Sequence, residues 1–448
     1  MRVPNARLLA WCGPCLPLAA LGLPLVVYLP PYYAGTLGLP LATVGFLFAL
    51  VRIIDIPLDP LIGAAMDQTR SRFGQFRPWL FAGSLVMMAG VFLLFTESPG
   101  VSPEKAFLNL FVLFLGYSMT FLAQTSWGSR LSPDYAERAR IFGWWTAFNV
   151  LGTILVLLIP PLVGGLDAAG GQGAGVQAMG WFIIALLPLT MLGTVLTVPE
   201  GQAAAPPHGI SVSALRDIMS DRRMLKLLAL DLMLAGIPAI AGALFLFMFT
   251  QVKGFTAQQT SVLLLFYFVA GLAAAPLWIR AAARYGKHRA VGAAAAGVAL
   301  AQLGILAIPA GNLPLAALGM AIAGLPFAAP GFLLRSMLAD LNDALRLDRQ
   351  RDGAEVRDTT GLTFALLTAT AKLGYAAPVG LLYPLLALFG FDPAPDATNE
   401  GLAITGLILV FVVPPLVFGA ISLWLAWTWP IDARAHADIR RELAGEGA

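Results

Sequence analysis

The stretch LATVGFLFALVRIIDIPLDPLIGAAM, residues 41–66, is apolar over most of its length but contains Arg52, Asp55 and Asp59. A helix needs about 20 residues to cross the hydrocarbon core of a bilayer, so this segment is long enough to span a membrane. A charge at the bilayer centre costs at least ~2.5 kcal/mol on insertion scales. The three charged side chains therefore need a place away from lipid.

Similar apolar stretches recur along the whole chain, in which 58% of the residues are hydrophobic and 12% are charged. Soluble domains carry about 25% charged residues, so the composition indicates an integral membrane protein. The apolar runs are continuous, whereas the strands of a membrane barrel alternate in polarity. We predict an all-α membrane protein with twelve spans, at residues 9–33, 41–66, 78–96, 106–128, 141–164, 178–198, 224–251, 259–280, 290–309, 314–338, 360–390 and 402–429.

Lys and Arg are distributed unevenly between the two sides of the predicted bundle. All but four of the 28 lie before the first span, after the last span, or in or next to every second connection. Of the four, Lys105 and Lys253 lie in the other connections, and Arg52 and Lys372 lie within spans. Basic loops stay in the cytoplasm, so we predict both termini to be cytoplasmic, in a bacterial-type inner membrane. The pI near 8.9 follows from this orientation and indicates no nucleic-acid partner.

The segment PEGQAAAPPHGISVSALRDIMSDRR, residues 199–223, is the longest polar connection of the first half and divides the spans six and six. We expect it to be a cytoplasmic linker with a short helix capped by Ser211 or Ser213. The predicted domains are an N-terminal six-helix bundle (1–198), this linker, a C-terminal six-helix bundle (224–430) and a cytoplasmic tail (431–448).

The two predicted halves share a short motif. RFGQFR (72–77) follows the second span and RYGKHR (284–289) follows the eighth. Internal repeats of this kind are typical of the major facilitator superfamily fold. We expect a tight turn at each central glycine, with arginine side chains that pair with nearby acids and form a cytoplasmic gate. The predicted gate residues are Asp67, Arg72, Arg77, Arg284 and Arg289.

The charges of the second span have helical spacing. Arg52, Asp55 and Asp59 are three and then four residues apart, so they lie on one helix face. One arginine and two aspartates give this face a net negative charge, which predicts a cation site with Asp55 and Asp59 as the pair. Ser118, in the fourth span, is our candidate for a third ligand. A proton needs only a carboxylate whereas Na⁺ needs several oxygen ligands, so H⁺ is favoured over Na⁺ as the coupling ion.

Two further charges lie within predicted spans. Lys372, in the eleventh span, has a depth similar to that of Asp55, and we expect it to engage an anionic substrate or to exchange partners with the acids of the second span. Asp231, in the seventh span, lies about two turns from the cytoplasm. We favour its interpretation as a snorkelling or cap-pairing acid over the alternative that it is a ligand.

Other interpretations of the membrane charges exist. They can form a permanent ionic lock in an uncoupled facilitator, or in an exporter of an amphiphilic or lipid-like solute. A receptor or scaffold without transport activity is a third possibility.

The sequence contains no catalytic signature that fits its context. WCGPC, residues 11–15, matches a thioredoxin active site, but it opens a transmembrane run where thioredoxin has a strand and then a helix, so we interpret the match as coincidence. The chain has no Walker-type loop, no histidine cluster and no serine elbow. We therefore predict neither an enzyme nor a cofactor.

RIIDIPLDPLIG followed by AAMDQTRSRFGQFRPW, residues 52–79, resembles the glycoside-pentoside-hexuronide:cation symporters. Weaker matches in the same order are LSPDYAERARIFGW (131–144), SMLADLND (336–343) and TATAKLGYA (368–376). The resemblance implies a secondary transporter that couples the symport of a sugar, a glycoside or another small solute to H⁺ or Na⁺ by alternating access. It also implies cation binding by the two second-span aspartates and a coupling role for Arg52 and Lys372.

The chain departs from that family at the predicted sugar site. Members that transport sugars carry carboxylates in the first and fourth helices, but residues 8–34 and 107–128 here contain none. Leu58 and Trp145 stand where the family has a polar residue and an arginine. The side chains that remain for a small-molecule substrate are Tyr32, Tyr33, Gln124, Trp127, Asn149, Tyr267, Thr370 and Tyr375. Of these, we predict Tyr32, Gln124, Trp127, Asn149 and Tyr375 to bind substrate.

Overall fold

The computed structural model describes residues 3–132, 135–164, 172–200, 212–351, 360–395 and 397–443. Within these ranges, twelve helices are long and apolar enough to span a membrane, as predicted. The largest difference from the predicted bounds is in the tenth span, which is Leu313–Arg351 where 314–338 was predicted. All regular elements in the described residues are helical, which confirms the predicted fold class.

The elements in chain order are α1 (Asn5–Cys12), α2 (Cys15–Leu23), η1 (Pro24–Tyr28), α3 (Leu29–Pro31), η2 (Tyr32–Thr36), α4 (Leu41–Gln68), α5 (Arg77–Phe95), α6 (Pro103–Arg130), α7 (Tyr135–Gly164), α8 (Gln172–Thr197), α9 (Val212–Ser220), α10 (Arg222–Phe247), η3 (Met248–Val252), α11 (Ala257–Tyr285), α12 (Lys287–Ala307), α13 (Leu313–Gly324), α14 (Ala329–Arg351), α15 (Thr360–Leu388), α16 (Leu402–Trp427) and α17 (Ala433–Leu443).

The first and tenth spans are interrupted helices. In the first, Pro14 lies between α1 and α2, and Pro24 opens the π-helical turn η1. Proline has no N–H to donate, so the regular hydrogen-bond ladder is broken at such positions. In the tenth, α13 ends at Gly324 and α14 begins at Ala329, with a tight turn between them in which the amide of Phe327 donates to the carbonyl of Gly324 (2.9 Å).

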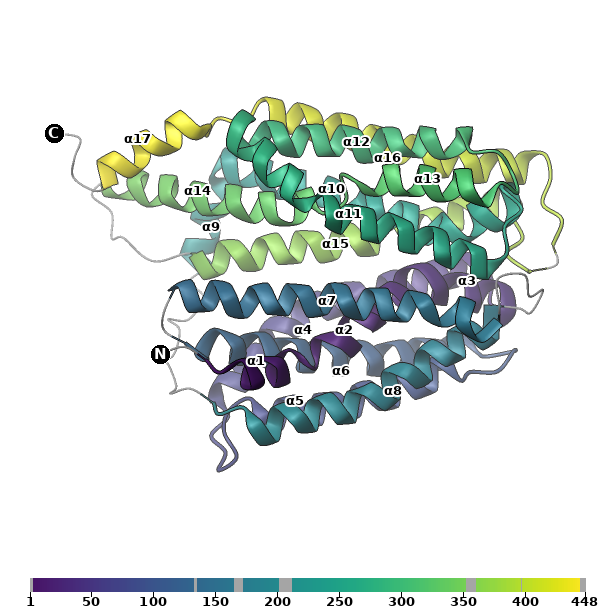
Figure 1. The fold of residues 1–448 in the computed structure, drawn as a ribbon, viewed down its shortest axis with the longest axis horizontal. Helices are drawn as coiled ribbons and strands as arrows, with labels where there is room; N and C mark the ends of the chain where they lie inside the picture. The colour runs from purple at the N-terminus through teal and green to yellow at the C-terminus, as the bar shows by residue number, and fades with distance from the viewer. Residues whose placement is uncertain are drawn as a thin grey trace. The chain divides into compact units, whose positions relative to one another are not determined.

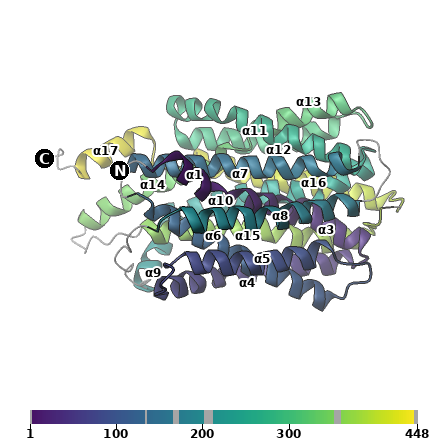
Figure 2. The same cartoon turned by 60° about the horizontal axis from the view of Figure 1, so that its bottom comes forward.

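The chain packs as two compact units. The first unit consists of Met1–Pro207, Gly242–Leu265 and Val379–Leu407. Within it, α5 and α6 run side by side (Figures 1 and 2) and approach closely, because Gly90 of α5 lies against the backbone of Leu113 and Gly116 of α6 lies against that of Met87. Small residues allow such close backbone contact between membrane helices.

Segments of the predicted C-terminal half complete the first unit. The hydroxyl of Tyr28 donates to Ser261 Oγ at 2.8 Å, and that of Tyr383 donates to the carbonyl of Ala243 at 3.0 Å. Gly45 of α4 lies against the Tyr383 side chain. This unit therefore joins parts of both predicted halves, and the six-and-six division of the chain stays a prediction.

The second unit consists of His208–Ala241, Phe266–Pro378 and Ile408–Ala448. Its apolar core includes Leu227 of α10, Val291 of α12 and Leu338 of α14. Both views show α17 against α14 (Figures 1 and 2), where His436 Nε2 lies 2.9 Å from Asp343 Oδ2. The predicted tail thus contains a helix that packs on this unit.

The linker ends with a capping aspartate. Asp221 Oδ1 accepts hydrogen bonds from the amides of Arg223 (2.7 Å) and Met224 (3.1 Å) at the start of α10. Burial raises the pKa of the Asp221 carboxyl, but its hydrogen bonds with Arg223 and Met224 outweigh burial and hold that pKa below its usual range. The short helix α9 precedes it. Of the two predicted caps, Ser213 lies inside α9, and Ser211 lies outside the described residues.

The two predicted tight turns are present. Gly74 has φ +108° and Gly286 has φ +93°, both in the left-handed region that favours glycine. Gly74 also lies directly against the carboxylate of Glu200, so any side chain at position 74 would collide with it.

Glu200 caps the N-terminus of α5 from across the chain. Its Oε2 accepts from the amide of Gln75 (2.6 Å), and its Oε1 accepts from the amides of Phe76 (3.0 Å) and Arg77 (2.7 Å). The first turn of a helix leaves such amides without intrahelical partners, and a negative charge there is favoured by the helix dipole. The segment after α8 therefore fixes the 72–77 turn in place.

We expect Glu200→Gln to destabilise the protein, because the amide replaces a charged acceptor of three backbone hydrogen bonds. The loss should be about 1–2 kcal/mol, in the range of a helix cap or a charge-assisted hydrogen bond. Thermal unfolding in detergent measures it, with Glu400→Gln at an exposed position as the matched control. Equal melting temperatures for the two variants would show that the cap contributes nothing.

Candidate functional site

Asp55 is at the centre of the first candidate site and is 2% exposed. Ser118 Oγ, from α6, donates to Asp55 Oδ1 at 2.7 Å. Arg52 NH1 lies 3.9 Å from Asp55 Oδ2, and the Arg52 guanidinium lies 4.1 Å from the centroid of the Phe114 ring. Packing of α4 against α6 thus brings Ser118 to Arg52 and Asp55, as predicted residues of one site. Ser118 is 63 positions from Asp55 along the chain.

The other predicted members of the coupling site are distributed over both units. Asp59 lies one turn beyond Asp55 on the same face of α4 and is half-buried. Lys372 is half-buried on α15, in the second unit. An exchange of partners between Lys372 and the acids of α4 stays a prediction.

Gln124 and the cysteine motif form a buried polar contact in the first unit. Gln124 Nε2 donates to the carbonyl of Trp11 (3.1 Å) and to Cys15 Sγ (3.1 Å). Cys12 and Cys15 are both buried and form no disulfide. The motif is thus part of a helical packing contact, with none of the strand-to-helix geometry of a thioredoxin site.

Three further substrate candidates of the first unit have internal partners. Tyr32 is buried with its ring edge-on to that of Tyr33, at 6.1 Å between centroids. Trp127 Nε1 donates to the carbonyl of Pro199 (3.2 Å), and Asn149 Nδ2 donates to a carbonyl one turn earlier in α7 (2.8 Å). Substrate binding by these residues and by Gln124 stays a prediction.

The predicted gate arginines have local contacts. Arg72 and Arg284 each lie over the aromatic ring that follows them in the sequence, at 4.8 and 5.4 Å. Arg77 donates to the carbonyl of Val198 (2.9 Å), and Arg289 is exposed. The side chain of Asp67 lies outside the described part of the chain. The gate stays a prediction.

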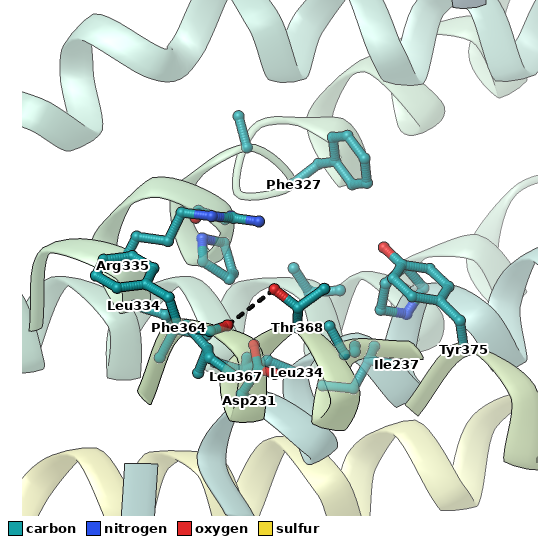
Figure 3. A pocket seen from close by; sticks show the side chains of 17 residues that line it. Asp231, Leu234, Ile237, Phe327, Leu334, Arg335, Phe364, Leu367, Thr368 and Tyr375 are labelled. Atoms are coloured by element: carbon teal, nitrogen blue, oxygen red, sulfur yellow. Dashed lines mark hydrogen bonds between the residues drawn. The ribbon is translucent and has the colours of Figure 1, made fainter. Parts of the chain in front are cut away.

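A cavity of about 270 Å³ lies within the second unit, lined by α10, α14 and α15 (Figure 3). Tyr375, one of the predicted substrate residues, lines it and is 38% exposed. Asp231 also lines it, is 8% exposed, and accepts a hydrogen bond on Oδ2 from Thr370 Oγ1 at 2.7 Å. The interpretation of Asp231 as a snorkelling or cap-pairing acid is therefore wrong, because its carboxylate is held inside the unit.

The break in the tenth span forms one wall of this cavity. Phe327 lies in the turn between α13 and α14, and Arg335 lies in the second turn of α14. The turn is held by Trp278, whose Nε1 donates to the carbonyl of Leu325 at 2.8 Å. Arg335 is one of the basic residues that were predicted on the cytoplasmic side, whereas the structure places it beside the cavity (Figure 3). The predicted substrate residue Tyr375 and the acid in the seventh span were the signals of this site in the sequence.

Known proteins resemble the chain over almost its whole length. A model of the family "MFS/sugar transport protein" matches residues 13–433. The inner membrane symporter YicJ of Escherichia coli (strain K12) is 25% identical over 90% of this chain and 86% of its own length. A lactose permease of Lactobacillus delbrueckii subsp. bulgaricus is 26% identical over 89% of this chain and 65% of its own length.

A solved D-xylose-proton symporter shares the fold, with a TM-score of 0.69 at 13% identity and coverage of 96% of this chain and 99% of that structure. The relatives and fold neighbours are carriers, so the chain is a membrane transporter and not an enzyme. By the extent of the family match, it belongs to the MFS/sugar transport protein family.

Proposed function

We propose that the protein is a cation-coupled sugar symporter that works by alternating access, with Asp55 and Asp59 as the cation site. The observation that carries the proposal is the buried Asp55 carboxylate, which faces Ser118 Oγ at 2.7 Å and Arg52 at 3.9 Å. Intramembrane ionisable residues are costly and usually mark ion pathways. The names of the relatives, a symporter and a lactose permease, support symport of a sugar.

The charge balance of α4 provides the coupling. Two carboxylates and one guanidinium give the face a net negative charge, and one bound cation neutralises it. During alternating access the carrier passes through a conformation in which the site is closed to both solutions. In that conformation, a neutral helix face costs less free energy than a charged one. If sugar binds more tightly to the cation-loaded carrier, linkage requires that the cation also binds more tightly when sugar is present.

A proton is the coupling ion that we expect. It needs a single carboxyl group, and the Ser118 hydroxyl can donate to the carboxylate in the unloaded state or accept from the carboxyl in the loaded one. Na⁺ prefers several oxygen ligands at once. Both ions are therefore tested in parallel.

The test is uptake of radiolabelled lactose and D-xylose by proteoliposomes that contain the purified protein. We expect one of these sugars to accumulate above equilibrium when the outside is made acidic, and the accumulation to collapse with a protonophore. A Na⁺ gradient at equal pH on both sides is the matched condition.

Sodium coupling has a second signature. A ligand present at 100 times its Kd stabilises the folded protein by about 2.7 kcal/mol, so NaCl would raise the melting temperature relative to choline chloride of the same ionic strength. Uptake that only reaches equilibrium under both gradients would overturn the proposal. It would support the uncoupled facilitator, in which Arg52 and the aspartates form a structural lock.

A further inference from the structure

We propose that the cavity around Asp231, Arg335 and Tyr375 is the sugar-binding pocket, and that it holds a single sugar ring in the C-terminal half of the chain. The inference rests on the proposed function as a sugar symporter. It adds the place of the sugar and the side chains that recognise it.

Asp231 supplies the hydrogen-bond acceptor. Thr370 Oγ1 donates to its Oδ2, and Figure 3 shows the carboxylate directed toward the cavity. Sugar hydroxyls are donors that a carboxylate binds through charge-assisted hydrogen bonds, which are stronger than neutral ones. The first span and residues 107–128 of the fourth contain no carboxylate, so Asp231 offers an acceptor that those helices lack.

Arg335 supplies the donors from the opposite wall. Its NH1 donates to the carbonyl of Gly331 at 2.5 Å, which anchors the guanidinium while other N–H groups face the cavity (Figure 3). The charges of Asp231 and Arg335 interact electrostatically across the cavity. Both side chains are in the described part of the chain, and they form no direct salt bridge with each other. A ligand that both donates and accepts hydrogen bonds, as a sugar does, fits the space between these two charges.

The remaining walls are apolar and aromatic. Phe327, Phe364 and Tyr375 line the cavity with Pro238 and Pro330. Ligand pockets combine such walls with a few oriented polar groups, and the C–H faces of a sugar ring pack against aromatic rings. The volume of about 270 Å³ lies just below the ~300–1,000 Å³ of drug-sized pockets, which suits one ring better than two.

The interrupted tenth span is an independent observation for a binding site here. Substrate sites of secondary transporters are typically formed by discontinuous helices near the bilayer midplane. The turn between α13 and α14 contributes Phe327 to the cavity and is fixed by the Trp278 hydrogen bond. A helix break at a purely structural contact would not need a carboxylate and a guanidinium on opposite sides of a cavity.

The experiment measures binding of D-xylose and lactose to the purified full-length protein by titration calorimetry, after the uptake test has identified which of them the parent protein accumulates. We expect Asp231→Asn to weaken binding of that sugar at least tenfold, since the amide keeps the Thr370 hydrogen bond but loses the charge. Ala371→Leu, which fills the cavity without removing a polar group, should also weaken it at least tenfold. Asp217→Asn, at an exposed position on α9, is the matched control.

The outcomes are distinct. Weaker binding in both cavity variants, with melting temperatures close to that of the parent, supports the pocket. Binding by Ala371→Leu that equals binding by the parent overturns the proposed pocket and leaves the proposed function intact. If Asp231→Asn fails to fold, the result for Ala371→Leu alone tests the pocket. A parent that accumulates none of the sugars overturns the proposed function and the pocket with it.

Discussion

Asp55→Asn should abolish ion-driven accumulation of sugar while exchange of sugar across the membrane continues. The amide keeps the acceptor for Ser118 Oγ, which lies 2.7 Å from the Asp55 carboxylate, but it cannot hold a proton or contribute charge to a cation site. We expect the accumulation ratio to fall at least tenfold, to near one, in proteoliposomes with an imposed pH gradient. Counterflow, which needs reorientation but no gradient, should persist.

Counterflow separates loss of coupling from loss of structure. Removing one member of a buried ion pair can cost about 3–5 kcal/mol, because it leaves the other charge buried. That is a large part of the ~5–15 kcal/mol by which native proteins are stable. A damaged protein would lose both activities, whereas an uncoupled carrier loses only accumulation. Asp59→Asn should behave as Asp55→Asn does, and Asp217→Asn, outside the membrane spans, should behave as the parent. Accumulation that survives in Asp55→Asn would exclude the cation assignment.

The spans and the tight turns were predictable because their signals are local. A run of apolar residues has to be helical in lipid, where no water satisfies the backbone, so the predicted second span, 41–66, agrees with Leu41–Met66. Gly74 and Gly286 were predictable for a similar reason, since the repeated motif identifies a position that needs a left-handed backbone. The tenth span extends past its predicted end at residue 338, because a charged helix can continue beyond the apolar run.

The contacts that join distant parts of the chain were only partly predictable. Ser118 was inferred as a neighbour of Asp55, and the structure places its hydroxyl on that carboxylate. Glu200 was assigned to a linker, because a cap whose amide partners lie 123 to 125 residues away leaves no local pattern. The pair of Asp231 and Arg335 was missed for the same reason. Only the packing of α10, α14 and α15 brings these residues to one cavity.

Gly116→Leu should prevent correct folding of the first unit, and Gly116→Ala should destabilise it measurably. A Cβ at Gly116 would lie 2.6 Å from the Cα of Met87 in α5, and one at Gly90 would lie 2.5 Å from the Cα of Leu113. These are backbone atoms of a packed helix pair, so no side-chain rotation can relieve the overlap. Overpacking of a close contact typically costs 1–3 kcal/mol for small additions, and a leucine adds several more atoms.

Gly193 in α8 provides the matched control, because a Cβ there meets nothing within 4 Å. Alanine is favoured over glycine in a helix by about 1 kcal/mol, so Gly193→Ala should leave the melting temperature unchanged or raise it, while Gly116→Ala lowers it. The two substitutions are chemically identical, so opposite signs isolate the contact between α5 and α6. Thermal unfolding in detergent, together with the monodisperse fraction in size-exclusion chromatography, measures both effects. Equal behaviour of the two alanine variants would mean that the close approach of these helices does not stabilise the fold.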